Sequence, residues 1–444
     1  MTSRLLAGVV LLVSVLVAWL AIRYALAARL LQALIGLSML YVGYLAFRGW
    51  RAMRDPLRAA ASGAGVATGD ATGRPWVSVV VPARNEAEAI GGAVADLGRQ
   101  AYADANGPRF DVVIVDDGST DGTGAQARAS AAPFANRVQV IRREPGTGSA
   151  TKAAVLQFAH PYLRGDVIAT IDADARLAPD FLERVMRAWQ RDPAAAAIQA
   201  QRRALNAGAG WLPAAQDDEL LMDMASQCGR WATGGTAELR GNGMFVKRPA
   251  LEAVGGWNEQ ALTEDLDLST SLVAVGEHVC LAPEAEVREE ALERLDPLWR
   301  QRLRWAEGSL RRLMERGPGL VVDGRLPVTR RLDFVVFVGE FVIPPLFATT
   351  TVASLVTVAL PRPADWSVPL ALVLGYGLGT FMLGLAGVAA QGEGGMSLFG
   401  RAARGALFLS HWLLVVPGAL LRITFWPRTV AFAQTPRVGS PRDR

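Results

Sequence analysis

Residues 110 to 119 read Phe110-Asp111-Val112-Val113-Ile114-Val115-Asp116-Asp117-Gly118-Ser119. The first six residues predict a buried β-strand, because β-branched and aromatic side chains dominate them. The strand ends directly in two adjacent carboxylates, and the residues that follow favour a turn. Polar groups at the carboxyl end of a buried strand are typical of an α/β fold, in which ligands bind at that edge of the sheet.

Strand and helix signals alternate on both sides of this stretch. The expected elements are strands at 76–81, 110–115, 138–141 and 167–171, with helices at about 86–102, 122–131, 150–160 and 180–190. This alternation predicts an α/β fold with a mostly parallel sheet and helices on both of its faces. Beyond residue 195 the alternation loosens, and further helices are expected at 215–231, 264–275 and 296–314.

Apolar residues are concentrated at the two ends of the chain. Hydrophobic residues make up 51% of the 444, and the excess lies in runs at 5–22, 30–47, 334–360, 368–390 and 406–421. A helix needs roughly 20 apolar residues to cross a bilayer, so each run is a candidate span. Arg48, Arg51, Arg54 and Arg58 follow the second run, and basic residues favour the cytoplasmic side. We therefore expect a multi-pass protein of the cell membrane whose central domain is cytoplasmic.

These patterns divide the chain into five parts. They are an N-terminal transmembrane hairpin at 1–58, a linker at 59–75, an α/β domain with interfacial helices at 76–325, a C-terminal transmembrane region at 326–425 and a basic tail at 426–444. Three C-terminal spans would place the basic tail outside, against the charge rule. One of them is therefore expected to be re-entrant or interfacial, and the candidate breaks are Pro344-Pro345 and Pro417-Gly418.

Charge and cysteine content argue against several other classes of function. The net charge of +4 is modest, so nothing points to nucleic acid as a partner. Cys228 and Cys280 are not spaced as metal ligands, and the three histidines are scattered along the sequence. Neither a zinc site nor a disulfide is expected in a cytoplasmic domain.

Two acidic clusters follow predicted strands directly. Asp172 and Asp174 lie two residues apart, where they can bind Mg²⁺ or Mn²⁺ while a diphosphate supplies further oxygen ligands. The alternative is a solvated turn or a helix cap. Asp116 and Asp117 can accept hydrogen bonds from a base or a ribose, and the alternative there is a turn that caps the next helix.

Lys152 and an acidic helix start are two further candidates. Lys152 follows the glycine-rich segment 146–149 at the start of a helix, where backbone N–H groups and an ammonium can bind phosphate. An ordinary turn with a solvated lysine is the alternative. Thr263-Glu264-Asp265 offers a carboxylate that can act as a general base, or simply a threonine cap followed by a favourable acidic first turn.

A helix rich in arginine and tryptophan contains the last candidate cluster. It reads Gln301-Arg302-Leu303-Arg304-Trp305. Arginine forks suit diphosphate oxygens, and an indole face suits a sugar ring. The alternative is an interfacial helix whose arginines extend to the membrane surface.

Taken together and in this order, the clusters resemble those of the membrane-integrated processive family-2 glycosyltransferases. That group contains the cellulose, chitin, hyaluronan and poly-N-acetylglucosamine synthases. The resemblance covers roughly residues 76–310. The matching stretches are Val79-Val80-Val81-Pro82-Ala83-Arg84-Asn85-Glu86, Asp116-Asp117-Gly118-Ser119, Asp172-Ala173-Asp174, Thr263-Glu264-Asp265 and Gln301-Arg302-Leu303-Arg304-Trp305.

The resemblance implies a GT-A (Rossmann-like) fold, a UDP-sugar donor, Mg²⁺ or Mn²⁺ as cofactor, and inversion at the anomeric carbon. It makes Asp265 the catalytic base and assigns the turn 240–244 to the acceptor side. The implied donor-binding residues are Pro82, Asn85, Glu86, Asp117, Lys152, Asp172, Gln301, Arg302 and Arg304. The implied metal ligands are Asp172 and Asp174, and the implied acceptor-binding residues are Glu264 and Trp305.

Three functions compete on this basis. The first is extension of a polysaccharide at the lipid bilayer and its export, with accessory export proteins as candidate partners. The chain departs from that group in having few recognisable C-terminal spans and no cyclic-nucleotide-binding domain after them. The second is a single-addition glycosyltransferase that makes a membrane glycolipid, for example from diacylglycerol. The third is a carbohydrate-binding or scaffold protein with a decayed site, which is disfavoured because every expected acid is present.

Overall fold

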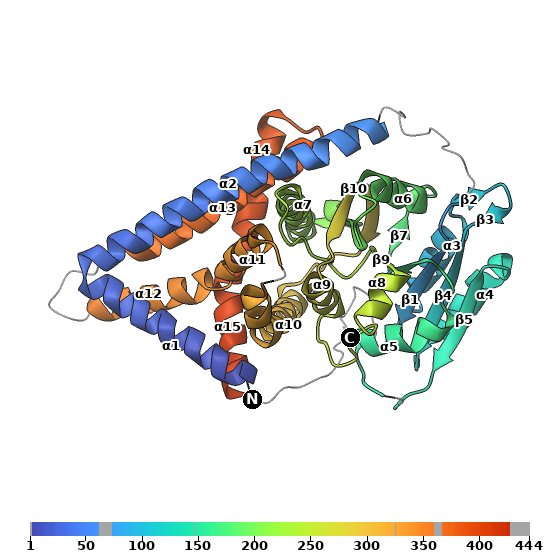
Figure 1. The fold of residues 1–444 in the computed structure, drawn as a ribbon, viewed down its shortest axis with the longest axis horizontal. Coiled ribbons are helices and arrows are strands. Elements are labelled where there is room, and N and C mark those ends of the chain that lie inside the picture. Colours follow the sequence, from blue (N-terminus) through green and yellow to red (C-terminus); the bar gives the residue numbers. More distant parts are fainter. Residues whose placement is uncertain (1, 62–72, 147, 325, 359–365, 427–444) are drawn as a thin grey trace.

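The computed structural model describes residues 2–61, 73–146, 148–324, 326–358 and 366–426. Within these residues an eight-stranded sheet has the order β5-β4-β1-β6-β9-β8-β10-β7 (Figure 1). The strands are β1 (Val77–Ala83), β4 (Phe110–Asp117), β5 (Val138–Arg143), β6 (Val167–Thr170), β7 (Arg176–Leu177), β8 (Ala197–Ala204), β9 (Met244–Lys247) and β10 (Val279–Glu289). The short strands β2 (Ala103–Asp104) and β3 (Gly107–Pro108) form a separate antiparallel pair.

The first half of the sheet confirms the expected α/β alternation. Strands β5, β4, β1 and β6 are parallel, and their side chains alternate between two apolar layers. Val79 packs on one face with α3 (Ile90–Gly98), α4 (Thr123–Ala131) and α6 (Phe181–Arg191). Val80 packs on the other face with α5 (Lys152–Ala159). This alternation follows from the period of two of a β-strand and buries both faces, as in other doubly wound folds.

The second half of the sheet differs from the expected, mostly parallel arrangement. Strand β9 is antiparallel to both of its neighbours, β6 and β8, and β7 is antiparallel to β10. The sheet is therefore mixed. Strand β9 follows α7 (Trp211–Ala232) and is only four residues long. Such a short apolar run has no periodicity that distinguishes a strand from a helix, and the sequence therefore did not predict it. The helices α8 (Arg248–Ala253) and α9 (Glu264–Ala274) come between β9 and β10.

The helices of the two ends lie beside the sheet domain (Figure 1). They are α1 (Thr2–Arg23), α2 (Ala25–Ala61), α11 (Val328–Glu340), α12 (Ile343–Val358), α13 (Ser367–Ala390), α14 (Gly395–Leu409) and α15 (Trp412–Phe425). Five segments of the described chain are long and apolar enough to cross a membrane. They are Ser3–Arg23, Ala25–Ala60, Val328–Thr357, Ser367–Ala390 and Gly395–Phe425. Four of the five apolar runs of the sequence lie within these segments, and the run at 334–360 lies within Val328–Thr357 as far as residue 357.

One of the two expected breaks in the C-terminal region is wrong. The first C-terminal segment does break next to Pro344, between the end of α11 and the start of α12 at Ile343. The third segment breaks between Leu409 and Trp412, whereas Pro417 lies inside α15. Proline is tolerated within helices that pack among other helices in a membrane. The bounds of the five parts remain predictions, and residues 62–72 of the linker and 427–444 of the tail lie outside the described residues.

Helix α10 (Leu295–Val322) joins the sheet domain to the candidate membrane helices. Its residues Ala306, Leu310 and Met314 pack in one apolar cluster with Val416 of α15 and Ala7 of α1. The apolar face of α10 is therefore buried against other helices of the chain. On its other faces, Arg302 and Arg312 pair with Glu219 and Glu238 of the sheet domain. Glu307 pairs instead with Arg422 of α15, so α10 contacts both parts of the protein.

Candidate active site

A cavity of about 630 Å³ runs from the carboxyl ends of β1, β4 and β6 to α10 and the candidate membrane helices. The carboxyl ends of parallel strands are where an α/β sheet binds its ligands. Of the residues that the resemblance assigns to the donor, the acceptor or the metal, all but Asn85 line this cavity. They are Pro82, Glu86, Asp117, Lys152, Asp172, Asp174, Glu264, Asp265, Gln301, Arg302, Arg304 and Trp305.

Asn85 connects two loops of the site. Its backbone adopts a positive φ of 53°, which asparagine tolerates better than most residues. Its N–H donates to Oγ of Ser119 at 3.1 Å, and its Oδ1 accepts from the N–H of Thr120 at 2.9 Å. The loop after β1 is thereby tied to the loop after β4. The N–H of Glu86 adds a second tie, since it donates to Oγ1 of Thr123 at 2.7 Å.

The two adjacent carboxylates at the end of β4 have different environments. Asp116 is buried, and its oxygens accept from the N–H of Ser119 at 3.0 Å and from Nη1 of Arg142 at 3.1 Å. Asp117 lines the cavity and lies 3.1 Å from Nη1 of Arg143. Burial raises the pKa of Asp117, although Arg143 opposes that shift. The turn interpretation therefore holds for Asp116, and Asp117 is the carboxylate that a ligand can reach.

Lys152 joins two of the predicted acidic clusters. Its Nζ lies 2.6 Å from Oδ1 of Asp172 and 3.1 Å from Oε1 of Glu264. Burial lowers the pKa of Lys152, but the two carboxylates outweigh burial and hold that pKa above its usual value. The lysine side chain is only 15% exposed, so the alternative of a solvated lysine on an ordinary turn is wrong. Lys152 is a permanent cation at the centre of the cavity wall.

Asp172 and Asp174 have the chemistry of a metal site that a ligand completes. Among the residues that the structure describes, no three His, Cys, Asp or Glu side chains gather as a metal cluster. Mg²⁺ is commonly held by one or two carboxylates together with phosphate oxygens, so two carboxylates on one turn fit a metal that arrives with a diphosphate. The turn is held by Asn242, whose Oδ1 accepts from the N–H of Asp172 at 3.1 Å and whose Nδ2 donates to Glu289 at 3.0 Å.

Asp265 lies in the first turn of α9 and faces the cavity. Burial and the neighbouring Glu264 raise the pKa of Asp265 to about 6. Gly241 passes close to this carboxylate: with φ of +80°, a Cβ there would lie 3.4 Å from Oδ2 of Asp265. Thr263 occupies the N-cap position of α9, as expected, but its side chain makes no capping hydrogen bond in the part of the chain described. The environment of Asp265 is that of a base poised near neutral pH.

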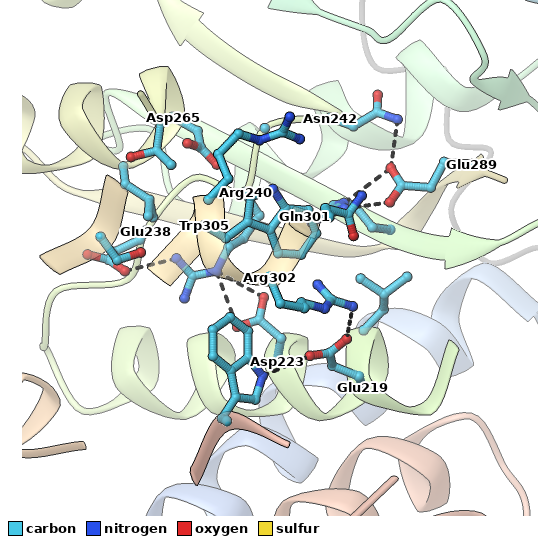
Figure 2. A pocket seen from close by; sticks show the side chains of 18 of the residues that line it. Glu219, Asp223, Glu238, Arg240, Asn242, Asp265, Glu289, Gln301, Arg302 and Trp305 are labelled. Carbon is cyan, nitrogen blue, oxygen red and sulfur yellow. Dashed lines mark hydrogen bonds and ion pairs between the residues drawn. The ribbon is translucent and has the colours of Figure 1, made fainter. Parts of the chain in front are cut away.

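The sequence did not reveal a charged cluster beside Asp265. Figure 2 shows Arg240 directed at Asp223 of α7 and at Glu238. The Nε of Arg240 lies 3.0 Å from Asp223, and its Nη1 lies 2.9 Å from Glu238. Burial would raise the pKa of Glu238, but Arg312 and then Arg240 lower it to about 2. The available signal was the spacing of Glu219 and Asp223, which places two acids on one face of a helix.

Arg302 supports Trp305 from within the protein. It is 3% exposed, donates to Oε2 of Glu219, and has its guanidinium 4.3 Å from the centroid of the Trp305 ring (Figure 2). The other oxygen of Glu219 accepts from Nε1 of Trp412 at 3.2 Å. The alternative of an arginine that extends to the membrane surface is therefore wrong for Arg302. Gln301 and Arg304 also line the cavity, and burial lowers the pKa of Arg304.

Comparisons with known proteins agree with this geometry. Residues 74–308 match the family described as Glycosyltransferase like family 2. The chain is 32% identical to a beta-monoglucosyldiacylglycerol synthase of Synechocystis sp. over 384 residues, which cover 85% of this chain and 78% of that protein. It is 27% identical to an N-acetylglucosaminyltransferase of Mesorhizobium japonicum over 255 residues, which cover 54% and 58%.

A solved structure has the same fold. It is a mannosyltransferase from Pyrobaculum calidifontis in complex with GDP-Man and Mn²⁺, with a TM-score of 0.59 and 20% identity. The match covers 89% of this chain and 99% of that one. The expected GT-A fold is thereby confirmed. The family match and the Synechocystis relative confirm the expected class of a transferase. On the match over 74–308 and the identity to the Synechocystis protein, the chain belongs to glycosyltransferase family 2.

Proposed function

We propose that this glycosyltransferase transfers a single hexosyl group from a UDP-sugar to the hydroxyl of a membrane lipid, with diacylglycerol as the acceptor. The observation that carries the proposal is the shared cavity. Its walls include the carboxylates and Lys152 at the sheet edge and also apolar residues of membrane helices, such as Val42 of α2 and Val416 of α15. A polar donor and an apolar acceptor can meet there at Asp265.

The comparisons favour this glycolipid function over extension of a polysaccharide. The relative at 32% identity is named for a monoglucosyldiacylglycerol product, and the match covers most of both chains. The match to an N-acetylglucosaminyltransferase has lower identity and covers 54% of this chain. A single addition to a lipid also needs no extrusion of a chain and no export partner.

The proposed reaction is a single displacement. The carboxylate of Asp265 takes the proton of the acceptor hydroxyl, whose oxygen forms a bond to the anomeric carbon. The bond from that carbon to the diphosphate oxygen breaks, UDP leaves, and the configuration at the anomeric carbon inverts. A base whose pKa is about 6 is largely ionised at neutral pH and still has affinity for a proton.

The donor is held by the remaining predicted residues. Asp117 and the loop 82–86 hold the uridine, while Gln301 and Arg304 contact the diphosphate. Arg302 is assigned to the donor by the resemblance, but its pairing with Glu219 favours another role. We propose that it positions Trp305 and does not contact the donor. Trp305 and Glu264 border the acceptor.

A divalent ion belongs to the proposed site. Asp172 and Asp174 would hold Mg²⁺ or Mn²⁺, which as a Lewis acid neutralises the charge of the leaving diphosphate. The Mn²⁺ in the Pyrobaculum mannosyltransferase complex supports this assignment. Lys152 adds a fixed positive charge to the same wall, since it contacts Asp172 at 2.6 Å.

In the proposed orientation the chain crosses the cell membrane several times and the sheet domain lies in the cytoplasm. It rests on the arginines that follow the second apolar run, at positions 48, 51, 54 and 58. A donor screen tests the function: purified protein in liposomes with diacylglycerol is incubated with individual UDP-hexoses, UDP-glucose first. UDP release and product mass are then measured. A lipid with one hexose is expected, and products that grow with time to many sugars would contradict the proposal.

A further inference from the structure

The part of the cavity farthest from the sheet has apolar walls. We call it the apolar wing and define it by Met39, Val42, Phe341, Ile343, Leu383 and Val416. These residues come from α2, the segment after α11, α12, α13 and α15. Each of these elements belongs to a segment that is long and apolar enough to span a membrane. The wing therefore lies at the depth of the hydrocarbon region, if those segments span the bilayer as proposed.

Two groups of helices form the wing. Helix α2 packs along α13, where a Cβ at Gly379 would lie 3.3 Å from Sδ of Met39, so glycine allows the two helices to approach closely (Figure 1). Helix α15 packs instead with α1 and α10, in the cluster that contains Ala7, Ala306 and Val416. Wing residues come from both groups, which places the wing between the α2–α13 pair and the helices around α15.

The hydroxyl groups near the wing are engaged within the helices. Oγ1 of Thr380 donates to the carbonyl of Tyr376 at 2.9 Å, and the hydroxyl of Tyr376 donates to the carbonyl of Leu409 at 3.2 Å. A sugar chain in the wing would lose hydration at its hydroxyls with few partners in return, which costs free energy. A hydrocarbon chain has no such cost and gains from burial.

The wing and the polar part of the cavity meet at Glu340. This residue ends α11, lines the cavity, and is within electrostatic range of Arg240 and Glu238. Arg240 is also close enough to Asp265 to affect its charge. A molecule with a polar end and an apolar tail therefore fits with its polar end toward Asp265 and its tail in the wing.

We infer that the apolar wing binds the acyl chain of the lipid acceptor next to its glycerol. This inference rests on the proposed function and adds the place where the acceptor is recognised. A cavity of about 630 Å³ is typical of one small-molecule site, which has about 300–1,000 Å³. The wing therefore holds the first part of a chain, and the remainder of the lipid stays in the bilayer.

Tryptophan substitutions test the inference. Val42→Trp and Leu383→Trp fill the wing from two different helices. Leu40→Trp on α2 and Leu378→Trp on α13 are matched controls, because those side chains are 74% and 52% exposed on the outer surface. The measurement is kcat/KM for dioleoylglycerol divided by kcat/KM for the short-chain dibutyrylglycerol. UDP binding by each purified variant reports whether the protein is folded.

The wing variants are expected to lower this ratio by about tenfold, as the loss of roughly two buried methylenes predicts. The control variants are expected to stay within about twofold of the wild type. If this ratio is the same in the wing variants as in the control variants, the inference is overturned and the proposed function stays intact. If the unaltered protein transfers no sugar to either glycerolipid, the proposed function itself fails, and the two failures are distinguishable.

Discussion

The ammonium of Lys152 lies 2.6 Å from Oδ1 of Asp172, and this contact joins the start of α5 to the turn after β6. The same ammonium reaches Glu264 at 3.1 Å, so it also connects to the helix that carries Asp265. The parts of the cavity that we propose for the donor and for the acceptor are therefore held together by one largely buried cation. Removing it would leave two carboxylates without their counter-charge.

Lys152→Met should lower catalytic activity more than it lowers the stability of the fold. Without the ammonium, Asp172 and Glu264 repel each other and the leaving diphosphate loses a positive charge. We expect kcat/KM for the UDP-sugar to fall by at least about tenfold. Steady-state kinetics with a varied donor concentration check this. Lys152→Arg keeps the charge and should retain more activity than Lys152→Met; equal losses in the two variants would contradict an electrostatic role.

Asp265→Asn should abolish most transfer without unfolding the protein. An amide is isosteric with the carboxylate but cannot take the proton of the acceptor hydroxyl. We expect kcat to fall by about 10²- to 10⁴-fold, the range typical of general-base catalysis. The matched control is Asp267→Asn on the same helix, where the carboxylate pairs with Arg316 at 3.3 Å and lies outside the set that lines the cavity. If both variants lost activity equally, the assignment of Asp265 as base would be wrong.

The pH dependence of transfer should report the raised pKa of Asp265. Burial and Glu264 raise it to about 6, and only the ionised carboxylate can act as base. The value of kcat/KM should therefore fall as the pH decreases through about 6 and level off above it. Glu264→Gln removes one cause of the shift and should move the inflection to lower pH. A profile that is flat between about pH 5 and 7 would contradict this assignment.

Arg302 and Glu219 should affect the acceptor more than the donor. Arg302 is buried against Trp305 and paired with Glu219, so Arg302→Leu should leave that carboxylate without its counter-charge and displace the indole. We expect the KM for the lipid acceptor to rise about tenfold, with a smaller change in the KM for the UDP-sugar. Glu219→Gln should give the same pattern. A larger effect on the donor would instead support direct contact of Arg302 with the diphosphate.

Removal of divalent cations should stop transfer reversibly. Dialysis against EDTA is expected to eliminate activity, and Mn²⁺ or Mg²⁺ should restore it. The metal ion supplies the positive charge that neutralises the leaving diphosphate, and the two anionic carboxylates only hold that ion. Isothermal titration with UDP should show tighter binding in the presence of Mn²⁺. Asp174→Asn should weaken that dependence on Mn²⁺. Full activity after EDTA treatment would exclude the proposed metal.

The sequence predicted secondary-structure elements and motifs better than the contacts that their side chains make. The Asp116-Asp117 pair was correctly expected at the end of a strand, but the sequence could not assign the turn to Asp116 and the cavity to Asp117. That division depends on Arg142 and Arg143 of the neighbouring strand β5. Likewise, Pro417 suggested a helix break, but the structure places this proline inside α15.

The sequence by itself determined the α/β alternation, the charged clusters and the apolar runs. These features depend on strand propensity, turn chemistry and side-chain hydropathy, which act over a few neighbouring residues. Only the tertiary structure decided that Lys152 bridges Asp172 and Glu264, that Arg302 pairs with Glu219, and that the candidate active-site cavity continues between the candidate membrane helices. Such contacts join segments that are distant in the chain, so the packing of whole helices and strands sets them, and no local pattern records it.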